Sequence, residues 1–128
     1  MMIQSFENAF KGAIKIVPVS ENEWKIVCNA SFIDGKPLDI RLVNNGTKWQ
    51  ITDKKQTLRY MNDLYELNAK DVKSCISNVL KVYGFQIQAG ALIVDIPSES
   101  AIMDKFFDYI MCVGQLTNMY AFFDEPNW

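Results

Sequence analysis

The sequence predicts a single α+β domain, and three observations lead to that prediction. Apolar and polar residues alternate through much of the first half of the chain, which is the period of half-buried strands. Apolar residues recur at helical spacing through most of the second half. The chain has 128 residues, enough for one core, so residues 1–128 are expected to form one domain. The expected order is an N-terminal helix, a three-stranded antiparallel meander, helices, a short hairpin and a long C-terminal helix.

The N-terminal helix is expected over residues 3–16. Phe6, Phe10 and Ile14 lie four residues apart, so they fall on one face of a helix. Pro18 limits how far the helix can continue, because proline lacks the backbone N–H and clashes with the preceding turn.

Three strands are expected next, at residues 23–33, 38–43 and 47–53, where apolar and polar side chains alternate. The sequences Asp34-Gly35 and Asn44-Asn45-Gly46 are typical of tight turns. Strands joined by such short turns pair antiparallel.

The second half is expected to contain three helices and one hairpin. The helices cover residues 57–64, residues 68–83 and residues 97–122. Residues 85–87 and 91–96 are expected to form the hairpin or, alternatively, one bent strand. Asn68 is a residue type that favours the N-cap of a helix, and Gly84 is one that favours its C-terminal end.

Composition restricts the kinds of partner. Hydrophobic residues make up 49% of the chain and charged residues 22%, as is ordinary for a globular domain. The net charge of −2 does not indicate a nucleic-acid-binding protein, and the densest basic cluster is a weak one, Lys48, Lys54, Lys55 and Arg59. No run of about 18 uncharged apolar residues is present, so no membrane-spanning segment is expected.

Cysteine use points to a reducing compartment. Cys28, Cys75 and Cys112 are widely separated and form no Cys-x-x-Cys pair, so free thiols are expected rather than a zinc ribbon. The first ten residues lack the long apolar core of a signal peptide. We therefore expect the protein in the cytoplasm.

The chain contains no histidine. This excludes Ser-His-Asp and Cys-His catalysis and the His-Glu-x-x-His metalloproteases. No glycine-rich nucleotide loop is present either. A protein without enzymatic activity and without a cofactor is therefore the first expectation.

One set of residues suggests an alternative. Asp39, Asp53 and Lys55 have the acid, acid-x-lysine order of restriction-endonuclease-like nucleases, in which two carboxylates hold Mg²⁺ and the lysine assists the attacking water. Glu7 could add a third ligand. Against this hypothesis, Asp53 is also a natural helix-capping residue, and Lys55 falls after the predicted strand has ended.

The last helix is apolar around too much of its surface to be covered on one side only. Beside the stripe that would face the core runs a second one, containing Met103, Phe107 and Met111. Either the first helix or the C-terminal tail covers this second stripe, or it contacts a partner, most simply in a homodimer. The tail residues Phe122, Phe123 and Trp128 are candidates for the same interaction surface.

Roughly residues 20 to 120 resemble the bacterial and phage domain-of-unknown-function family 1828. The resemblance is carried by Trp49-Gln50-Ile51-Thr52-Asp53, by Thr57-Leu58, by Tyr83-Gly84 and by the long apolar last helix. Lys55 occupies the place of the family's usual glycine after the aspartate, so the resemblance does not favour a shared Asp53 and Lys55 catalytic pair.

The resemblance implies a prokaryotic, phage or mobile-element setting and carries no established activity. In that setting we expect a non-enzymatic protein-interaction module, in its sharpest form an anti-CRISPR-like inhibitor of a host nucleic-acid-targeting defence complex. An acidic surface can occupy a basic nucleic-acid groove on such a partner.

Overall fold

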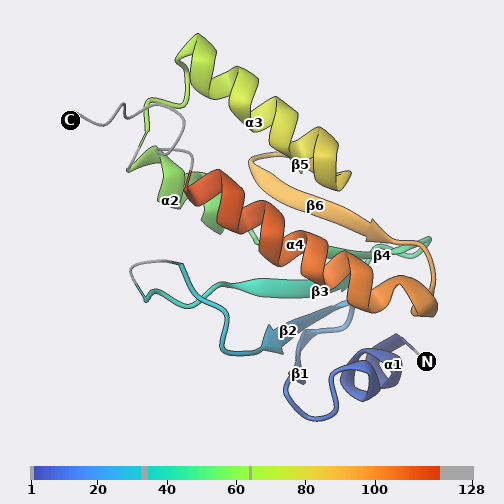
Figure 1. Ribbon diagram of the computed structural model, residues 1–128. Helices are drawn as coiled ribbons and strands as arrows, with labels where there is room; N and C mark the ends of the chain where they lie inside the picture. The colour runs from blue at the N-terminus through green and yellow to red at the C-terminus, as the bar shows by residue number, and fades with distance from the viewer. Residues whose placement is uncertain (1, 33–34, 64, 119–128) are drawn as a thin grey trace.

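A computed structural model describes residues 2–32, 35–63 and 65–118. It has two layers, a six-stranded antiparallel sheet and a layer of helices on one of its faces (Figure 1). The α+β prediction is confirmed. The elements are α1 (Met2–Ala9), β1 (Lys15–Ser20), β2 (Glu23–Val27), β3 (Ile40–Asn44), β4 (Trp49–Thr52), α2 (Gln56–Asn62), α3 (Lys70–Tyr83), β5 (Gln86–Gln88), β6 (Ala91–Ile96), the 3-10 turn η1 (Glu99–Ala101) and α4 (Ile102–Thr117). The strand order in the sheet is β1-β2-β3-β4-β6-β5.

The first helix is shorter than expected, and a strand follows it that the sequence analysis missed. Helix α1 ends at Ala9, and Lys11 and Gly12 both have positive φ angles, of 48° and 85°, which turn the chain back. The next residues form β1, which pairs antiparallel with β2. Pro18 is tolerated there because β1 is an edge strand of the sheet. The prediction of a helix over residues 3–16 is therefore wrong after Ala9, and the meander has four strands.

The meander strands are also shorter than their sequence patterns. Strand β2 ends at Val27, and the following loop contains one isolated bridge, between Ser31 and Pro37. The expected Asn44-Asn45-Gly46 turn is confirmed. Gly46 has a φ of 97°, and its N–H donates to Asn44 Oδ1 at 2.9 Å.

The two ends of α3 test two predictions about helix caps, one of which is wrong and one confirmed. The N-cap of α3 is Ala69, without a side-chain hydrogen bond, so the prediction of Asn68 as the N-cap is wrong. Gly84 ends the helix as predicted, with a left-handed φ of 72° and its N–H directed to the carbonyls of Leu80 and Lys81. The predicted hairpin is confirmed as β5 and β6. The last helix is shorter than the predicted residues 97–122, because α4 begins at Ile102, after η1, and ends at Thr117 with Asn118 as its C-cap.

The core lies between the sheet and the helices. From the sheet it receives Ile26, Ile40, Leu42, Ile51 and Leu92, all at most 1% exposed, and from the helices Phe6, Met61, Ile102, Tyr109 and Leu116, buried to the same degree. Helix α1 is attached to α4 through aromatic contacts: the Phe6 and Phe106 rings meet edge to face with centroids 5.7 Å apart. No helix among the described residues is long and apolar enough to cross a membrane.

Candidate functional site

Asp53 stands at the end of β4 and is completely buried, with 0% of its surface exposed. Its carboxylate accepts three backbone hydrogen bonds. Oδ1 accepts the N–H of Lys55 at 2.9 Å and of Leu92 at 3.0 Å, and Oδ2 accepts the N–H of Thr57 at 2.9 Å. One side chain therefore joins the end of β4 to the first turn of α2 and to β6.

The chain around Asp53 turns sharply. Lys54 and Lys55 both have left-handed φ angles, of 51° and 74°, and the N–H of Gln56 donates to the Asp53 carbonyl at 3.1 Å. Asp53 supplies the acceptors for the N–H groups of Lys55 and Thr57, which the turn itself leaves without backbone partners. The N-cap residue of α2 is Lys55 rather than Asp53. The Asp53 carboxylate nevertheless accepts the Thr57 N–H in the first turn of α2, and its contacts extend to β6 as well.

The charge of Asp53 affects two groups of the core. Burial raises the pKa of the Cys112 thiol to about 12, and the Asp53 carboxylate adds to the increase. Burial, with the same carboxylate as the next cause, raises the pKa of the Tyr109 hydroxyl well above its ordinary value. Both groups are therefore neutral at physiological pH, and Cys112 is not an activated nucleophile.

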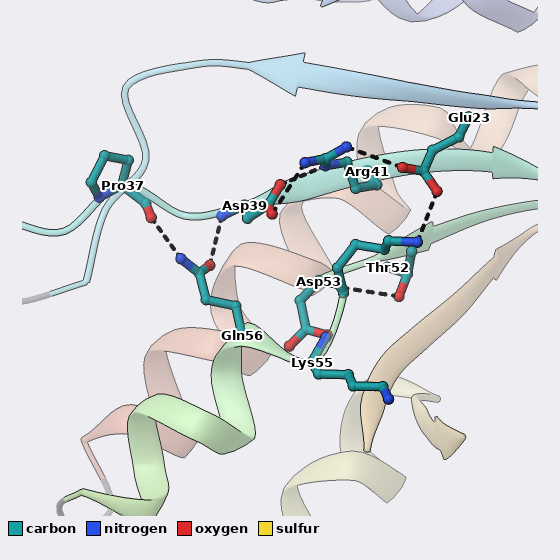
Figure 2. Close-up of polar contacts among 9 residues, drawn as sticks. Glu23, Pro37, Asp39, Arg41, Thr52, Asp53, Lys55 and Gln56 are labelled. Carbon is teal, nitrogen blue, oxygen red and sulfur yellow. Dashed lines mark hydrogen bonds and ion pairs between the residues drawn. The ribbon is translucent and has the colours of Figure 1, made fainter. Parts of the chain in front are cut away.

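Asp39 lies apart from the Asp53 carboxylate, in a chain of charges along the sheet (Figure 2). Arg41 donates to Asp39 Oδ1 at 2.6 Å and to Oδ2 at 3.3 Å, and its Nη1 reaches Glu23 Oε2 at 3.0 Å. Lys54 Nζ binds the other Glu23 oxygen at 2.9 Å. The hydrogen bond to Asp39, above all, raises the pKa of Arg41. Two cations and two carboxylates alternate in this chain, so their charges balance.

Gln56 attaches this chain of charges to the helix layer. Its Oε1 accepts the Asp39 backbone N–H at 2.6 Å, and its Nε2 donates to the Pro37 carbonyl at 2.9 Å. The side chains of Glu23, Arg41 and Gln56 were not among the sequence candidates. The only signal for them was that Asp39 and Arg41, two residues apart on a strand, share one face.

The carboxylates of the acid, acid-x-lysine set have separate partners: Asp39 pairs with Arg41, and Asp53 accepts backbone N–H groups. Figure 2 shows the Lys55 side chain pointing away from both carboxylates. Its stem lies beside the β5–β6 turn, where a Cβ added to Gly90 would be 3.9 Å from Lys55 Cγ and Cδ. Within the described residues, no three Asp, Glu, Cys or His side chains are grouped closely enough to hold a metal ion, and Glu7 lies on α1. A metal ion at Asp53 would have to displace backbone N–H groups.

Two of the four residues in the weak basic cluster pair with neighbouring acids. Lys48 pairs with Asp95 at 3.1 Å and Lys54 with Glu23, while Lys55 and Arg59 make no ion pair within the part of the chain that the structure describes. The hollow of about 330 Å³ beside this cluster is lined by three cations, Lys36, Lys54 and Arg59, together with the acids Asp39 and Asp63. The two signs are mixed here, so the local charge does not favour a polyanion.

Lys55 is strained, and this gives a testable stability effect. Lys55→Gly is expected to raise the free energy of unfolding by about 1 kcal/mol, because a left-handed backbone costs an L residue about 1–2 kcal/mol and costs glycine little. Urea unfolding measures the change. Lys55→Ala is the matched control, since it removes the charge and keeps the Cβ. A glycine variant no more stable than the alanine variant would contradict the expected strain.

The second stripe of α4 is exposed. Met103 has 44% of its surface exposed, Phe107 52% and Met111 53%. The opposite face of the helix is buried in the core, including Phe106 and Tyr109. The turn after helix α1 reaches the edge of the stripe, where the centroids of the Phe10 and Phe107 rings lie 5.9 Å apart. The N-terminal segment therefore contacts one edge of the stripe and does not cover it, contrary to the expectation that the first helix would.

The remaining candidates for the interaction surface, Phe122, Phe123 and Trp128, lie outside the described residues. The C-terminal tail also lies outside the described residues, so the alternative that the tail covers the stripe stays a prediction.

No family model, no curated protein and no solved structure matches this chain.

Proposed function

We propose that the chain is a non-enzymatic protein-interaction module that associates with a second copy of itself through the α4 stripe, Met103, Phe107 and Met111. The observation that supports this proposal is the exposure of three large apolar side chains on successive turns of one helix. Neighbouring apolar side chains of this size, left in water together, are typical of a protein-binding surface. The smallest product of such association is a homodimer.

The energetics of the stripe are adequate for weak to moderate affinity. Complete burial of an exposed Met or Phe side chain contributes about 1.5–3 kcal/mol, and each stripe residue has about half of its surface to lose. Methionine adapts its shape to different partners, which suits an interaction surface.

The biological setting is a further part of the proposal. The resemblance carried by residues 49–53 and by the last helix supports a phage or mobile-element protein. The three free cysteines support a location in the reducing cytoplasm. Asp104 and Asp108 stand beside the stripe on α4. An acidic border around an apolar stripe would suit a partner that binds nucleic acid, so we include an anti-CRISPR-like inhibitor within the proposal.

Sedimentation velocity tests the role of the stripe. Phe107→Glu and Met111→Glu are each expected to raise the dissociation constant of self-association about tenfold or more, because a carboxylate would be buried in an apolar contact. Both side chains are exposed in the monomer, so circular dichroism should remain unchanged.

The matched control is Val82→Glu. Val82 is the most exposed large hydrophobic residue in the described part of the chain, at 74%, and it lies on α3 rather than on the stripe. It should leave association unchanged. Equal association of the wild type, Phe107→Glu and Met111→Glu would contradict the proposal.

A further inference from the structure

A second exposed apolar surface lies on the opposite layer of the domain, on the sheet face that carries no helix. In the β1–β2 register Lys15 stands opposite Val27 and Val17 opposite Lys25. Val17 is 45% exposed and Val27 44%, whereas Ile26, on the other face of β2, is 1% exposed. These four residues, Lys15, Val17, Lys25 and Val27, form the β1–β2 patch, in which apolar and basic side chains alternate.

The charges beside the α4 stripe are opposite to those of the β1–β2 patch. Asp104 and Asp108 lie one turn apart on α4, so their Cβ atoms are separated by about 5–6 Å. Lys15 and Lys25 are diagonal neighbours on paired strands, about 7–8 Å apart. Two aspartates can therefore face two lysines at a similar spacing.

The described residues of the monomer offer these charges no partner. In the described part of the chain, Asp104, Asp108, Lys15 and Lys25 make no ion pair or side-chain hydrogen bond. Lys105 lies between the two aspartates in sequence, and its charge acts on Asp95 of β6. The acidic border of the stripe is thus left for a partner.

The two surfaces lie on opposite faces of the domain, so one copy cannot bring its own stripe onto its own patch (Figure 1). A second copy can do so. The helix layer of one copy would then cover the bare sheet face of the next, in the way helices cover sheets inside domains.

We propose that self-association is head-to-tail: Met103, Phe107 and Met111 of one copy pack on Val17 and Val27 of the next, and Asp104 and Asp108 pair with Lys15 and Lys25. This inference rests on the proposed function and adds the surface that receives the stripe. The copy at each end of such an assembly has one of its two surfaces in contact and the other free. The contact is heterologous, because two different surfaces meet in it.

A mixing experiment tests the arrangement. Phe107→Glu removes the stripe and leaves the patch, and Val17→Glu removes the patch and leaves the stripe. Each variant alone is expected to sediment as a monomer, whereas their equimolar mixture forms a 1:1 dimer through the one intact pair of surfaces. The dimer should dissociate more as salt is raised, because its ion pairs are screened.

The control is Ile87→Glu, an exposed apolar residue on β5 at the other edge of the sheet, which should associate like the wild type. Circular dichroism verifies folding, and Lys25→Glu replaces Val17→Glu if that variant unfolds.

Each remaining outcome decides between the two proposals. If the sheet variant associates like the wild type while Phe107→Glu is monomeric, the stripe binds another stripe and the head-to-tail inference is overturned. A mixture that stays monomeric overturns it too. A wild type that is itself monomeric, or a Phe107→Glu variant that still associates, removes the proposed function as well.

Discussion

Asp53→Ala is expected to lower the free energy of unfolding by about 4 kcal/mol. The substitution removes a carboxylate that accepts three backbone N–H groups, and the bonds from Thr57 and Leu92 are buried. Each buried donor left without a partner costs about 1–3 kcal/mol, and bonds to a charged acceptor are stronger than neutral ones. Urea unfolding, followed by circular dichroism, measures the loss.

Asp39→Ala is the matched control. Its carboxylate side chain is 31% exposed, and its bonds are to the Arg41 side chain rather than to buried backbone groups. We expect a loss of about 1 kcal/mol or less. Equal losses for the two alanine variants would show that Asp53 does not join β4, α2 and β6 as described. The same result would favour the alternative hypothesis that Asp39 and Asp53 act together as a pair.

Phe6→Ala is expected to cost about 3–5 kcal/mol, because it removes a completely buried ring and leaves a cavity. The Phe6 ring meets Phe106 edge to face and lies 5.6 Å from Phe10, so it is the centre of the contact between α1 and α4. Hydrogen exchange should show the amides of α1 losing protection before those of α3.

Phe107→Ala serves as the comparison, since its ring is 52% exposed and also lies beside Phe10. Its cost should be about 1 kcal/mol or less in the monomer. If the two variants lose the same stability at low protein concentration, α1 is not held by Phe6.

The sequence was informative wherever one local signal acted without competition. Gly84 and the Asn44-Asn45-Gly46 turn require backbone conformations that few residues adopt, and both were placed correctly. Strand β1 was missed because Phe6, Phe10 and Ile14 fit helical spacing, although Ile14 belongs to the turn before the strand. Only pairing with β2 stabilises residues 15–20 as a strand, and local spacing does not reveal pairing.

The candidate site shows the same division. Helical spacing alone placed Met103, Phe107 and Met111 together on one face, and the structure leaves that face exposed. The contacts of Asp53 were foreseen only in part: capping of the next helix is local, whereas the bond from Leu92 joins residues 39 positions apart. The β1–β2 patch required the register of an unpredicted strand, so no sequence pattern could have indicated it.

Sedimentation velocity of the wild-type protein, from low micromolar to near-millimolar concentration, tests the central claim most directly. The account predicts that the weight-average mass rises from the 14.7 kDa of a single chain toward at least twice that value. Under the same conditions Phe107→Glu should remain at the mass of one chain. A wild-type mass that stays at 14.7 kDa over the whole range would contradict self-association through the α4 stripe.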